Sequence, residues 1–272
     1  MNIHDFGTFD RDMILFGGVY SNRQALDALE QAATGYGIGP DAMICTGDLV
    51  AYCGDPVAVV DRAMELGFPV VAGNCEIQLA AGALGCGCGF EAGTACDILS
   101  RGWYAHASGA LSSRHRDYFR ACPDIGHFVH NGRRFAVIHG GVNDVARFIW
   151  SNAPDAIFDR EIADLVAHLG PVDGVVAGHS GIAFTRQIGG VTWINAGVIG
   201  MPPNRGMPAV ECVRLGRAGP EILPLSYDHH GARAAMMRAG LTQGYHEALV
   251  TGHWPNEDIL PPDLRRDQSA RG

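Results

Sequence analysis

Four polar side chains with metal-binding chemistry each follow an apolar stretch of the chain and lie beside a glycine. The pairs are Gly47 with Asp48, Gly73 with Asn74, His139 with Gly140, and Gly178 with His179. A carboxylate, an amide and two imidazoles form an oxygen and nitrogen ligand set that suits Zn²⁺, Mn²⁺ or Fe²⁺. The adjacent glycines allow sharp backbone turns and leave room for an oxyanion. These residues therefore predict a transition-metal site.

Short apolar runs precede these residues and are expected to form buried strands. The runs cover residues 13–16, 42–46, 69–72, 135–138 and 174–177. Helical patterns between them favour an α/β fold, with Ser21 capping a helix over residues 22–33 and Pro56 opening the next one. In a parallel or mixed sheet the carboxyl ends of the strands share one edge, so the four polar side chains should converge there.

Length and composition indicate a single domain over residues 1–272. With 272 residues, of which 47% are apolar, the chain can bury a sizeable core. A segment rich in cysteine and glycine, at about residues 78–123, interrupts the alternation of strands and helices and is interpreted as an inserted cap. Residues from about 228 to 272 are expected to form a helical extension, and the first dozen residues to be loose.

Charge and hydropathy narrow the classes of partner. A formal net charge of −9 and a pI near 5.7 argue against nucleic-acid polymers and anionic membranes, whereas a small phosphorylated substrate remains compatible. No apolar stretch approaches the ~20 residues of a membrane span, and the N-terminal residues lack a signal-peptide pattern. We therefore expect a cytoplasmic protein whose eight cysteines are reduced thiols. The sequence leaves the oligomeric state open.

Five motifs between Met13 and Leu215 carry a resemblance to a known family. They read TGDLVAYCGDP, VVAGNCE, VIHGG, VVAGHS and INAGVIGMP. Their order and spacing resemble the calcineurin-like metallophosphoesterases, particularly the small bacterial phosphodiesterase-like branch. The resemblance implies a four-layer α/β/β/α sandwich with two metal ions at the strand ends, bridged by the aspartate that Asp48 matches. It also implies that the second ion is held by Asp48, Asn74, His139 and His179.

The ligands of the first ion in that family are missing from the matching positions. Gly18 and Tyr20 occupy the positions of the family's Asp-x-His motif, Gly181 stands at the end of G-H-x-H, and Cys75 replaces the histidine of G-N-H-D/E. Phosphoester cleavage at a two-metal site uses both ions to stabilise the developing charge. We therefore expect one transition metal ion per chain (Zn, Mn or Fe), with Asp48 as a terminal ligand and not a bridge.

These patterns predict a metal-dependent phosphoesterase with an altered, mononuclear site that acts on phosphomonoesters or phosphodiesters. Asn74 and Gly140 would help to place the phosphate, while Cys75 or Tyr20 would take over proton transfer. The alternative is structural: Asp48 as a turn or helix-capping residue, Asn74 as a turn residue, and the two histidines as satisfied interior side chains.

Two other functions remain open on the sequence alone. A catalytically weak or inactive phosphate-binding or nucleotide-binding protein on the same fold would explain why three ligand positions carry Gly18, Tyr20 and Gly181. A redox or metal-handling protein would instead depend on Cys75, Cys86 and Cys88. The GCGCG segment has no partner pair at zinc-finger spacing, which makes the last signal weak.

Overall fold

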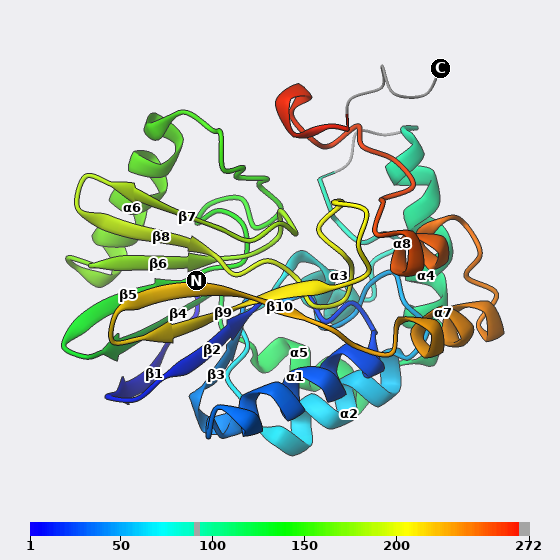
Figure 1. The fold of residues 1–272 in the computed structure, drawn as a ribbon, viewed down its shortest axis with the longest axis horizontal. Coiled ribbons are helices and arrows are strands. Elements are labelled where there is room, and N and C mark those ends of the chain that lie inside the picture. The colour runs from blue at the N-terminus through cyan, green and yellow to red at the C-terminus, as the bar shows by residue number, and fades with distance from the viewer. Residues whose placement is uncertain (90–92, 267–272) are drawn as a thin grey trace.

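The chain folds into two β-sheets that pack face to face, with helices on their outer faces (Figure 1). The structure is a computed structural model, and it describes residues 1–89 and 93–266. The order of layers is helix, sheet, sheet, helix. The α/β class and the four-layer α/β/β/α sandwich are therefore confirmed.

The larger sheet has six strands and is mixed. Its order is β1-β4-β5-β6-β8-β7. Parallel pairing joins β1 to β4, β5 to β6 and β6 to β8, and antiparallel pairing joins β4 to β5 and β7 to β8. The strands are β1 (Ile3–Phe9), β4 (Ile125–His130), β5 (Arg133–Val137), β6 (Gly174–Ala177), β7 (Phe184–Ile188) and β8 (Val191–Asn195).

The smaller sheet has four strands in the order β10-β9-β2-β3. β2 pairs in parallel with the edge strand β3, while β9 runs antiparallel to both β2 and β10. The stretch predicted as a strand at residues 69–72 adds only one bridge, between Cys45 and Val70. The strands are β2 (Met13–Phe16), β3 (Met43–Cys45), β9 (Val210–Gly216) and β10 (Gly219–Leu225).

Alternating side chains of the larger sheet fill two different cores. On β5, Phe135 and Val137 belong to the core between the sheets, whereas Ala136 packs with Phe158 of α6 (Asp155–Leu169) on the outer face. Successive side chains of a strand point to opposite faces, so an unbroken apolar strand must be covered on both. Each fully buried large side chain contributes roughly 1.5–3 kcal/mol, and this burial fixes the register at the strand ends.

Helices cover the outer face of the smaller sheet and one end of the sandwich. In Figure 1, α1 and α2 lie below β2 and β3, while α4, α7 and α8 gather at the opposite end from the hairpins of the larger sheet. The helices are α1 (Arg23–Gly35), α2 (Pro56–Leu66), α3 (Asn74–Ala81), α4 (Ala95–Ala110), α5 (Ser113–Ala121), α7 (His229–Arg238) and α8 (Tyr245–Thr251). Short 3-10 turns cover Pro40–Ala42 and Pro262–Leu264.

Three local predictions are corrected by the structure. The first residues are not loose, because β1 pairs with β4 as an edge strand of the larger sheet. The cap of α1 is Asn22, whose side chain accepts a hydrogen bond from the N–H of Ala25, and not Ser21. The four polar side chains do not share one sheet edge: Asp48 follows a strand of the smaller sheet, and both histidines follow strands of the larger one.

Hydropathy gives one further result. Among the helices of residues 1–89 and 93–266, none is both long enough and apolar enough to cross a membrane.

Candidate metal centre

The turn after β3 carries Asp48 into the space between the ends of the two sheets. Asp48 is 4% exposed and adopts a left-handed backbone conformation, with φ of 58°. Gly47 precedes it with φ of 96°, and a Cβ there would lie 2.9 Å from Nδ1 of His139 and 2.7 Å from the backbone nitrogen of Gly73. Only glycine allows this approach, and a strained backbone held by its surroundings is typical of functional sites.

The carboxylate of Glu76, in the first turn of α3, holds this turn in place. It accepts hydrogen bonds from the backbone N–H groups of Asp48 (2.7 Å), Leu49 (2.8 Å) and Gly73 (2.9 Å). Burial and the neighbouring Asp48 charge raise the pKa of Glu76 to about 7, although the backbone donors oppose the rise. Glu76 therefore positions Asp48 from behind, through the main chain.

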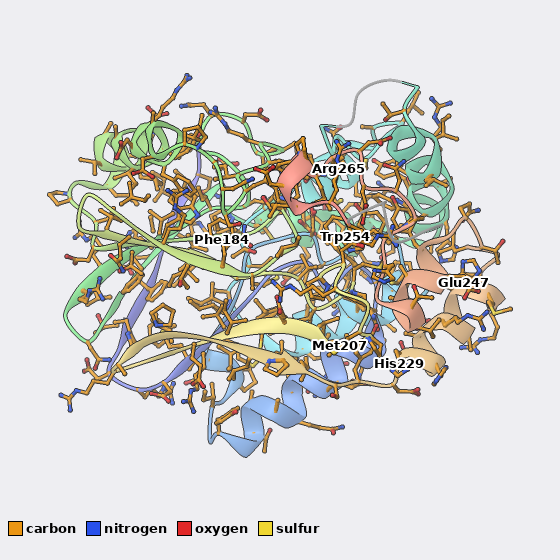
Figure 2. All side chains as sticks on the ribbon, turned by 45° about the horizontal axis from the view of Figure 1, so that its top comes forward. Phe184, Met207, His229, Glu247, Trp254 and Arg265 are labelled. Carbon is orange, nitrogen blue, oxygen red and sulfur yellow. A yellow bond between two sulfur atoms is a disulfide. The ribbon has the colours of Figure 1, made fainter. Side chains whose placement is uncertain are left out.

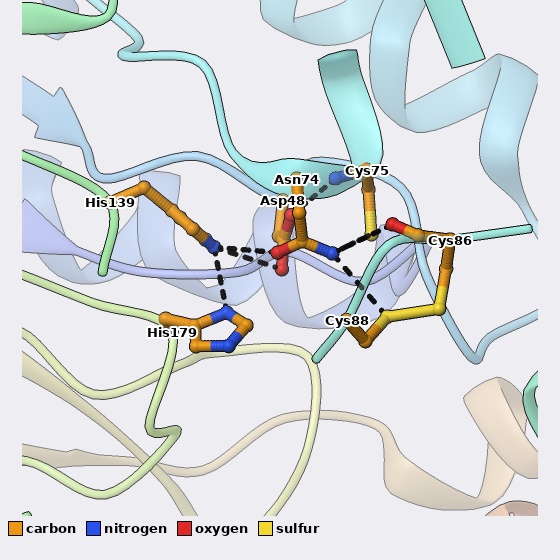
Figure 3. The surroundings of a disulfide bond; sticks show 7 residues. All are labelled: Asp48, Asn74, Cys75, Cys86, Cys88, His139 and His179. Atoms are coloured by element: carbon orange, nitrogen blue, oxygen red, sulfur yellow. Dashed lines mark hydrogen bonds and ion pairs between the residues drawn. A yellow bond between two sulfur atoms is a disulfide. The ribbon is translucent and has the colours of Figure 1, made fainter. Parts of the chain in front are cut away.

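His139 lies at the centre of the site, and its two ring nitrogens have different neighbours. Its Nδ1 lies 2.6 Å from the carbonyl oxygen of Thr46, a contact that requires a proton on Nδ1. Its Nε2 lies 3.1 Å from Oδ1 of Asn74, 3.0 Å from Nδ1 of His179 and 3.3 Å from Oδ2 of Asp48 (Figure 3). A carbonyl acceptor that fixes the tautomer in this way is common for histidines that bind metals through the other nitrogen.

Asn74, the first residue of α3, is oriented by its amide nitrogen. Nδ2 donates to the carbonyl oxygen of Cys86 at 3.0 Å and lies 3.3 Å from Sγ of Cys88. With the nitrogen end held by this loop, the oxygen end faces His139 (Figure 3). Asn74 therefore presents an oxygen lone pair to the centre of the site.

His179 completes the group from the turn after β6. Its backbone φ is 62°, its side chain is buried, and its ring lies 4.3 Å from the ring of Phe148 between centroids. Burial and the neighbouring His139 lower the pKa of His179 to about 3, so its imidazole is neutral at physiological pH. A neutral imidazole is the form that binds a metal ion.

The electrostatics of the group favour a bound cation. Burial raises the pKa of Asp48, but the two histidines lower it by a larger amount, so the net change is a decrease. Burial lowers the pKa of His139, but the Asp48 carboxylate raises it, with a net increase. The ligand atoms of Asp48, His139 and His179 all lie within 4.8 Å of one another, so one ion can contact all three.

A cavity of about 50 Å³ adjoins the group and is lined mainly by apolar and aromatic side chains. Among the described residues, its walls contain no lysine or arginine. The C-terminal extension closes one side: the indole N–H of Trp254 donates to the carbonyl oxygen of Pro202 at 2.7 Å, and Figure 2 shows Trp254 in this covering segment. The lining residues are Tyr20, Asp48, Ala51, Tyr52, Cys75, Cys88, Phe148, His179, Ser180, Gly181, Val198, Met201, Tyr245, Trp254, Asn256 and Ile259.

Two residues that the sequence indicates for proton transfer also line this cavity. Tyr20 is 6% exposed and Cys75 is 1% exposed. Burial, followed by the charge of Asp48, raises the pKa of both groups well above their usual values. Both side chains therefore carry their protons at neutral pH, and neither is a ready base or nucleophile.

Gly140 has a packing reason to be glycine. A Cβ there would overlap the carbonyl oxygen of Val145 and lie 2.8 Å from that of Arg147. The backbone of the following loop therefore presses directly on Gly140. Its role in placing a phosphate stays a prediction.

The expectation that every cysteine is a reduced thiol is wrong for one pair, since Cys86 and Cys88 form a disulfide. The two residues are separated by Gly87, whose φ of 63° turns the chain so that both side chains reach each other. Cys45, Cys53, Cys75, Cys122 and Cys212 are free. The disulfide borders the metal centre, because Cys88 lines the cavity.

Several residues around the site escaped the sequence analysis. The covering residues Trp254 and Tyr245, and the Phe148 ring on His179, lie far from Asp48 in sequence and belong to no motif. The contact between His139 and Thr46 uses a backbone carbonyl, which every residue type has, so the sequence pattern does not indicate it. Glu76 had a signal, because an acidic residue stands two positions after Asn74 in the VVAGNCE motif.

The two facing sheets and the Asp, Asn and His cluster at their ends define an α/β sandwich of the metallophosphoesterase type. The chain belongs to the calcineurin-like phosphoesterase superfamily, whose domain model matches residues 22–216. This match confirms the family that the motifs indicate.

Solved structures show the same fold at low sequence identity. A metallophosphoesterase from Sphaerobacter thermophilus is 17% identical, with a TM-score of 0.68 over 90% of this chain and 100% of that one. A hypothetical protein from Pyrococcus horikoshii OT3 is 15% identical, with a TM-score of 0.72 over 89% of this chain and 99% of that one. A search of curated proteins finds no match.

Proposed function

We propose that this protein is a metal-dependent phosphoesterase that works with one transition metal ion, held by Asp48, Asn74, His139 and His179. One observation carries the proposal. Nε2 of His139 faces three other lone-pair groups at 3.0 to 3.3 Å. Lone pairs that converge in a buried site repel one another unless a cation, either a proton on Nε2 or a metal ion, lies between them. Their chemistry suits Zn²⁺, Mn²⁺ or Fe²⁺.

An ion held by these four residues would supply Lewis-acid polarisation of a phosphoryl oxygen. The protein contributes the orientation of the ligands: Glu76 fixes the Asp48 turn, and the Thr46 carbonyl fixes the His139 tautomer. The aromatic walls exclude bulk water and lower the local dielectric, which strengthens every charge interaction in the site. A small phosphorylated molecule is the substrate class that we propose, since the cavity is narrow.

Proton delivery to the leaving group falls to a residue other than histidine. Cys75 and Tyr20 both line the cavity beside Asp48 and both keep their protons. The phenol of Tyr20 is the stronger candidate, because a hydroxyl hydrogen-bonds to oxygen better than a thiol does. Loss of the hydroxyl in Tyr20→Phe is therefore expected to lower kcat for substrates with poor leaving groups more than for those with good ones.

The experiment compares hydrolysis of p-nitrophenyl phosphate and bis(p-nitrophenyl) phosphate by metal-stripped protein before and after addition of Mn²⁺, Fe²⁺ or Zn²⁺. The proposal expects turnover only with metal, and loss of turnover in His139→Ala. His115→Ala is the control, because His115 is buried beside Asp61 outside the cavity. Turnover that is equal with and without metal, or absent with all three ions, contradicts the proposal.

A non-catalytic phosphate-binding or nucleotide-binding role is the second candidate. It is favoured by the glycines at 18 and 181, which replace ligands of the first ion in the resembling family. A thermal-shift screen with phosphate and nucleotides, in EDTA and in Mn²⁺, separates the two functions. Stabilisation by a ligand in EDTA without turnover in Mn²⁺ would support this second role.

A further inference from the structure

Three cysteines surround the amide nitrogen of Asn74, two through their sulfur atoms and one through its backbone carbonyl. Sγ of Cys75 lies 3.5 Å from Nδ2, Sγ of Cys88 lies 3.3 Å from it, and the backbone carbonyl of Cys86 accepts its hydrogen bond (Figure 3). All three cysteines are at least nine-tenths buried. A free thiol and a disulfide therefore share one polar contact at the edge of the metal centre.

Both cysteines whose sulfur atoms face Asn74 line the same cavity as the metal ligands. Cys75 and Cys88 line the cavity together with Asp48 and His179. The backbone N–H of Cys75 also donates to Oδ1 of Asp48 at 3.1 Å, which ties the thiol-bearing residue to that carboxylate. The cysteine cluster is thus continuous with the oxygen and nitrogen site and lies on the side of Asn74 opposite His139.

We propose that reduction of the Cys86–Cys88 disulfide creates a second metal site, in which the thiols of Cys75, Cys86 and Cys88 bind a thiophilic cation such as Zn²⁺ or Cd²⁺. Sulfur ligands select such ions, whereas the neighbouring carboxylate, amide and imidazoles accept harder ones. This site does not depend on phosphoester hydrolysis. It would place a soft ion and a harder ion on the two sides of Asn74.

The chemistry balances with a dithiol as reductant. The dithiol gives two electrons and two protons to the Cys86–Cys88 bond, which breaks to two thiols, while the two sulfur atoms of the reductant join as a disulfide. Binding of the cation then displaces the thiol protons to solvent, since the thiolate is the metal ligand. In the oxidised protein only Cys75 retains a free thiol at this place, and a single thiol is too weak a ligand set.

The site also gives a reason for the contacts of Asn74. Its Nδ2 donates to the loop that carries the disulfide, and its Oδ1 faces His139. Rearrangement of Cys86 on reduction therefore alters the donor contact that orients a ligand of the first ion. Occupation of the two sites is expected to be coupled through this one side chain.

Cadmium is a suitable probe, because Cd²⁺–thiolate bonds absorb in the ultraviolet and Cd²⁺ bound to oxygen and nitrogen does not. Full-length protein, reduced with a dithiol and then freed of it, is titrated with Cd²⁺ beside oxidised protein. We expect a thiolate band that saturates at one equivalent in the reduced protein only. Absence of the band from the reduced protein, or the same band in oxidised protein, would overturn the proposal.

Single serine variants locate the ligands. The affinity for Cd²⁺, measured from the thiolate band, is expected to fall at least tenfold in each of Cys75→Ser, Cys86→Ser and Cys88→Ser. Cys122→Ser, outside the cavity, should leave this affinity unchanged. Where a variant unfolds, protection of the reduced wild-type thiols by Cd²⁺ against alkylation, mapped by mass spectrometry, identifies the same residues. Protection that omits Cys75, Cys86 and Cys88 counts against the site.

The thiol site and the phosphoesterase proposal fail in different ways. His139→Ala removes a ligand of the oxygen and nitrogen site, and it is expected to abolish metal-dependent hydrolysis while the Cd²⁺–thiolate band persists. A protein that lacks hydrolysis but shows the band retains the cysteine site. A protein that hydrolyses phosphoesters without the band has the oxygen and nitrogen site but lacks the cysteine site.

Discussion

The ring of Tyr20 lies on Gly18, so that a Cβ at residue 18 would overlap three ring atoms. In the resembling family these two positions carry the aspartate and histidine of the first metal motif. Here the aromatic ring fills the space that a side chain at 18 would need. Gly18 and Tyr20, which replace the first ligand pair, are therefore packed against each other. This packing supports a site with one ion at Asp48.

This packing predicts a non-additive response to restoring the motif. Gly18→Asp alone forces the new side chain against the Tyr20 ring, and overpacking of this kind costs about 1–3 kcal/mol in the free energy of unfolding. Adding Tyr20→His removes the ring edge, so the double variant should be more stable than the single one. Urea denaturation measures the coupling, and equal, additive losses in the two variants would contradict it.

Replacement of Glu76 by Gln tests its role behind Asp48. A carboxamide has one acceptor oxygen, so at least one of three buried N–H groups loses its partner, which costs about 1–3 kcal/mol of stability. Because the Asp48 turn then loosens, we expect weaker metal binding as well. Calorimetric titration with Mn²⁺ or Zn²⁺ measures the affinity.

Glu161→Gln is the matched control for that experiment. Glu161 is equally buried, accepts the N–H of Val142 at 2.7 Å and binds Arg147 at 2.9 Å, away from the cavity. It should lose stability but keep its metal affinity. If both variants lose affinity to the same degree, the effect of Glu76 is general destabilisation.

Trp254 is expected to limit the exchange of the bound ion. Its indole forms part of the cavity wall near Gly181, and Trp254→Ala would open that wall. A barrier lower by about 1.4 kcal/mol makes exchange tenfold faster, and we expect an effect of that order in the rate at which EDTA removes the ion. Trp254→Phe keeps most of the wall and should exchange much more slowly than the alanine variant; equal rates would show that the wall does not limit exchange.

His130 predicts a dependence of stability on pH that is independent of the metal centre. It is 3% exposed and its Nε2 lies 3.1 Å from the carbonyl oxygen of Arg11; burial lowers its pKa below the usual 6.5. Below pH 6.5 the unfolded chain therefore binds more protons at this residue than the folded one. Its contribution to stability is present above that pH and is lost as pH falls towards the folded-state pKa.

The measurement is the free energy of unfolding at pH 7.5 and pH 5.5, for the wild type and His130→Gln. Between these two values the wild type should lose more stability than the variant. An identical loss in both proteins would assign the pH dependence to other groups.

Much of the metal centre could be predicted because its ligands follow buried strands. Asp48, Asn74, His139 and His179 each stand at the end of an apolar run beside a glycine, and backbone geometry brings such positions together. The same signal does not show that two sheets, and not one, supply them. That arrangement depends on β9 pairing with β2, a long-range contact with no local pattern.

Three other features could not be predicted from the sequence, each for its own physical reason. The polar sequence of β1 hides an edge strand, since only a few of its side chains need burial. The disulfide depends on the backbone turn at Gly87, which composition does not reveal. The covering role of Trp254 depends on how the C-terminal extension packs, and no motif marks it.

The most direct test of the central claim is a metal titration in which bound ions and phosphodiester hydrolysis are followed on the same sample. Metal-stripped, oxidised protein is titrated with Mn²⁺ or Zn²⁺, and bound metal is measured by elemental analysis. We predict that activity rises linearly and stops at one ion per chain, and that His179→Ala binds no stoichiometric ion. Activity that requires a second ion, or a protein that binds none, would contradict the account.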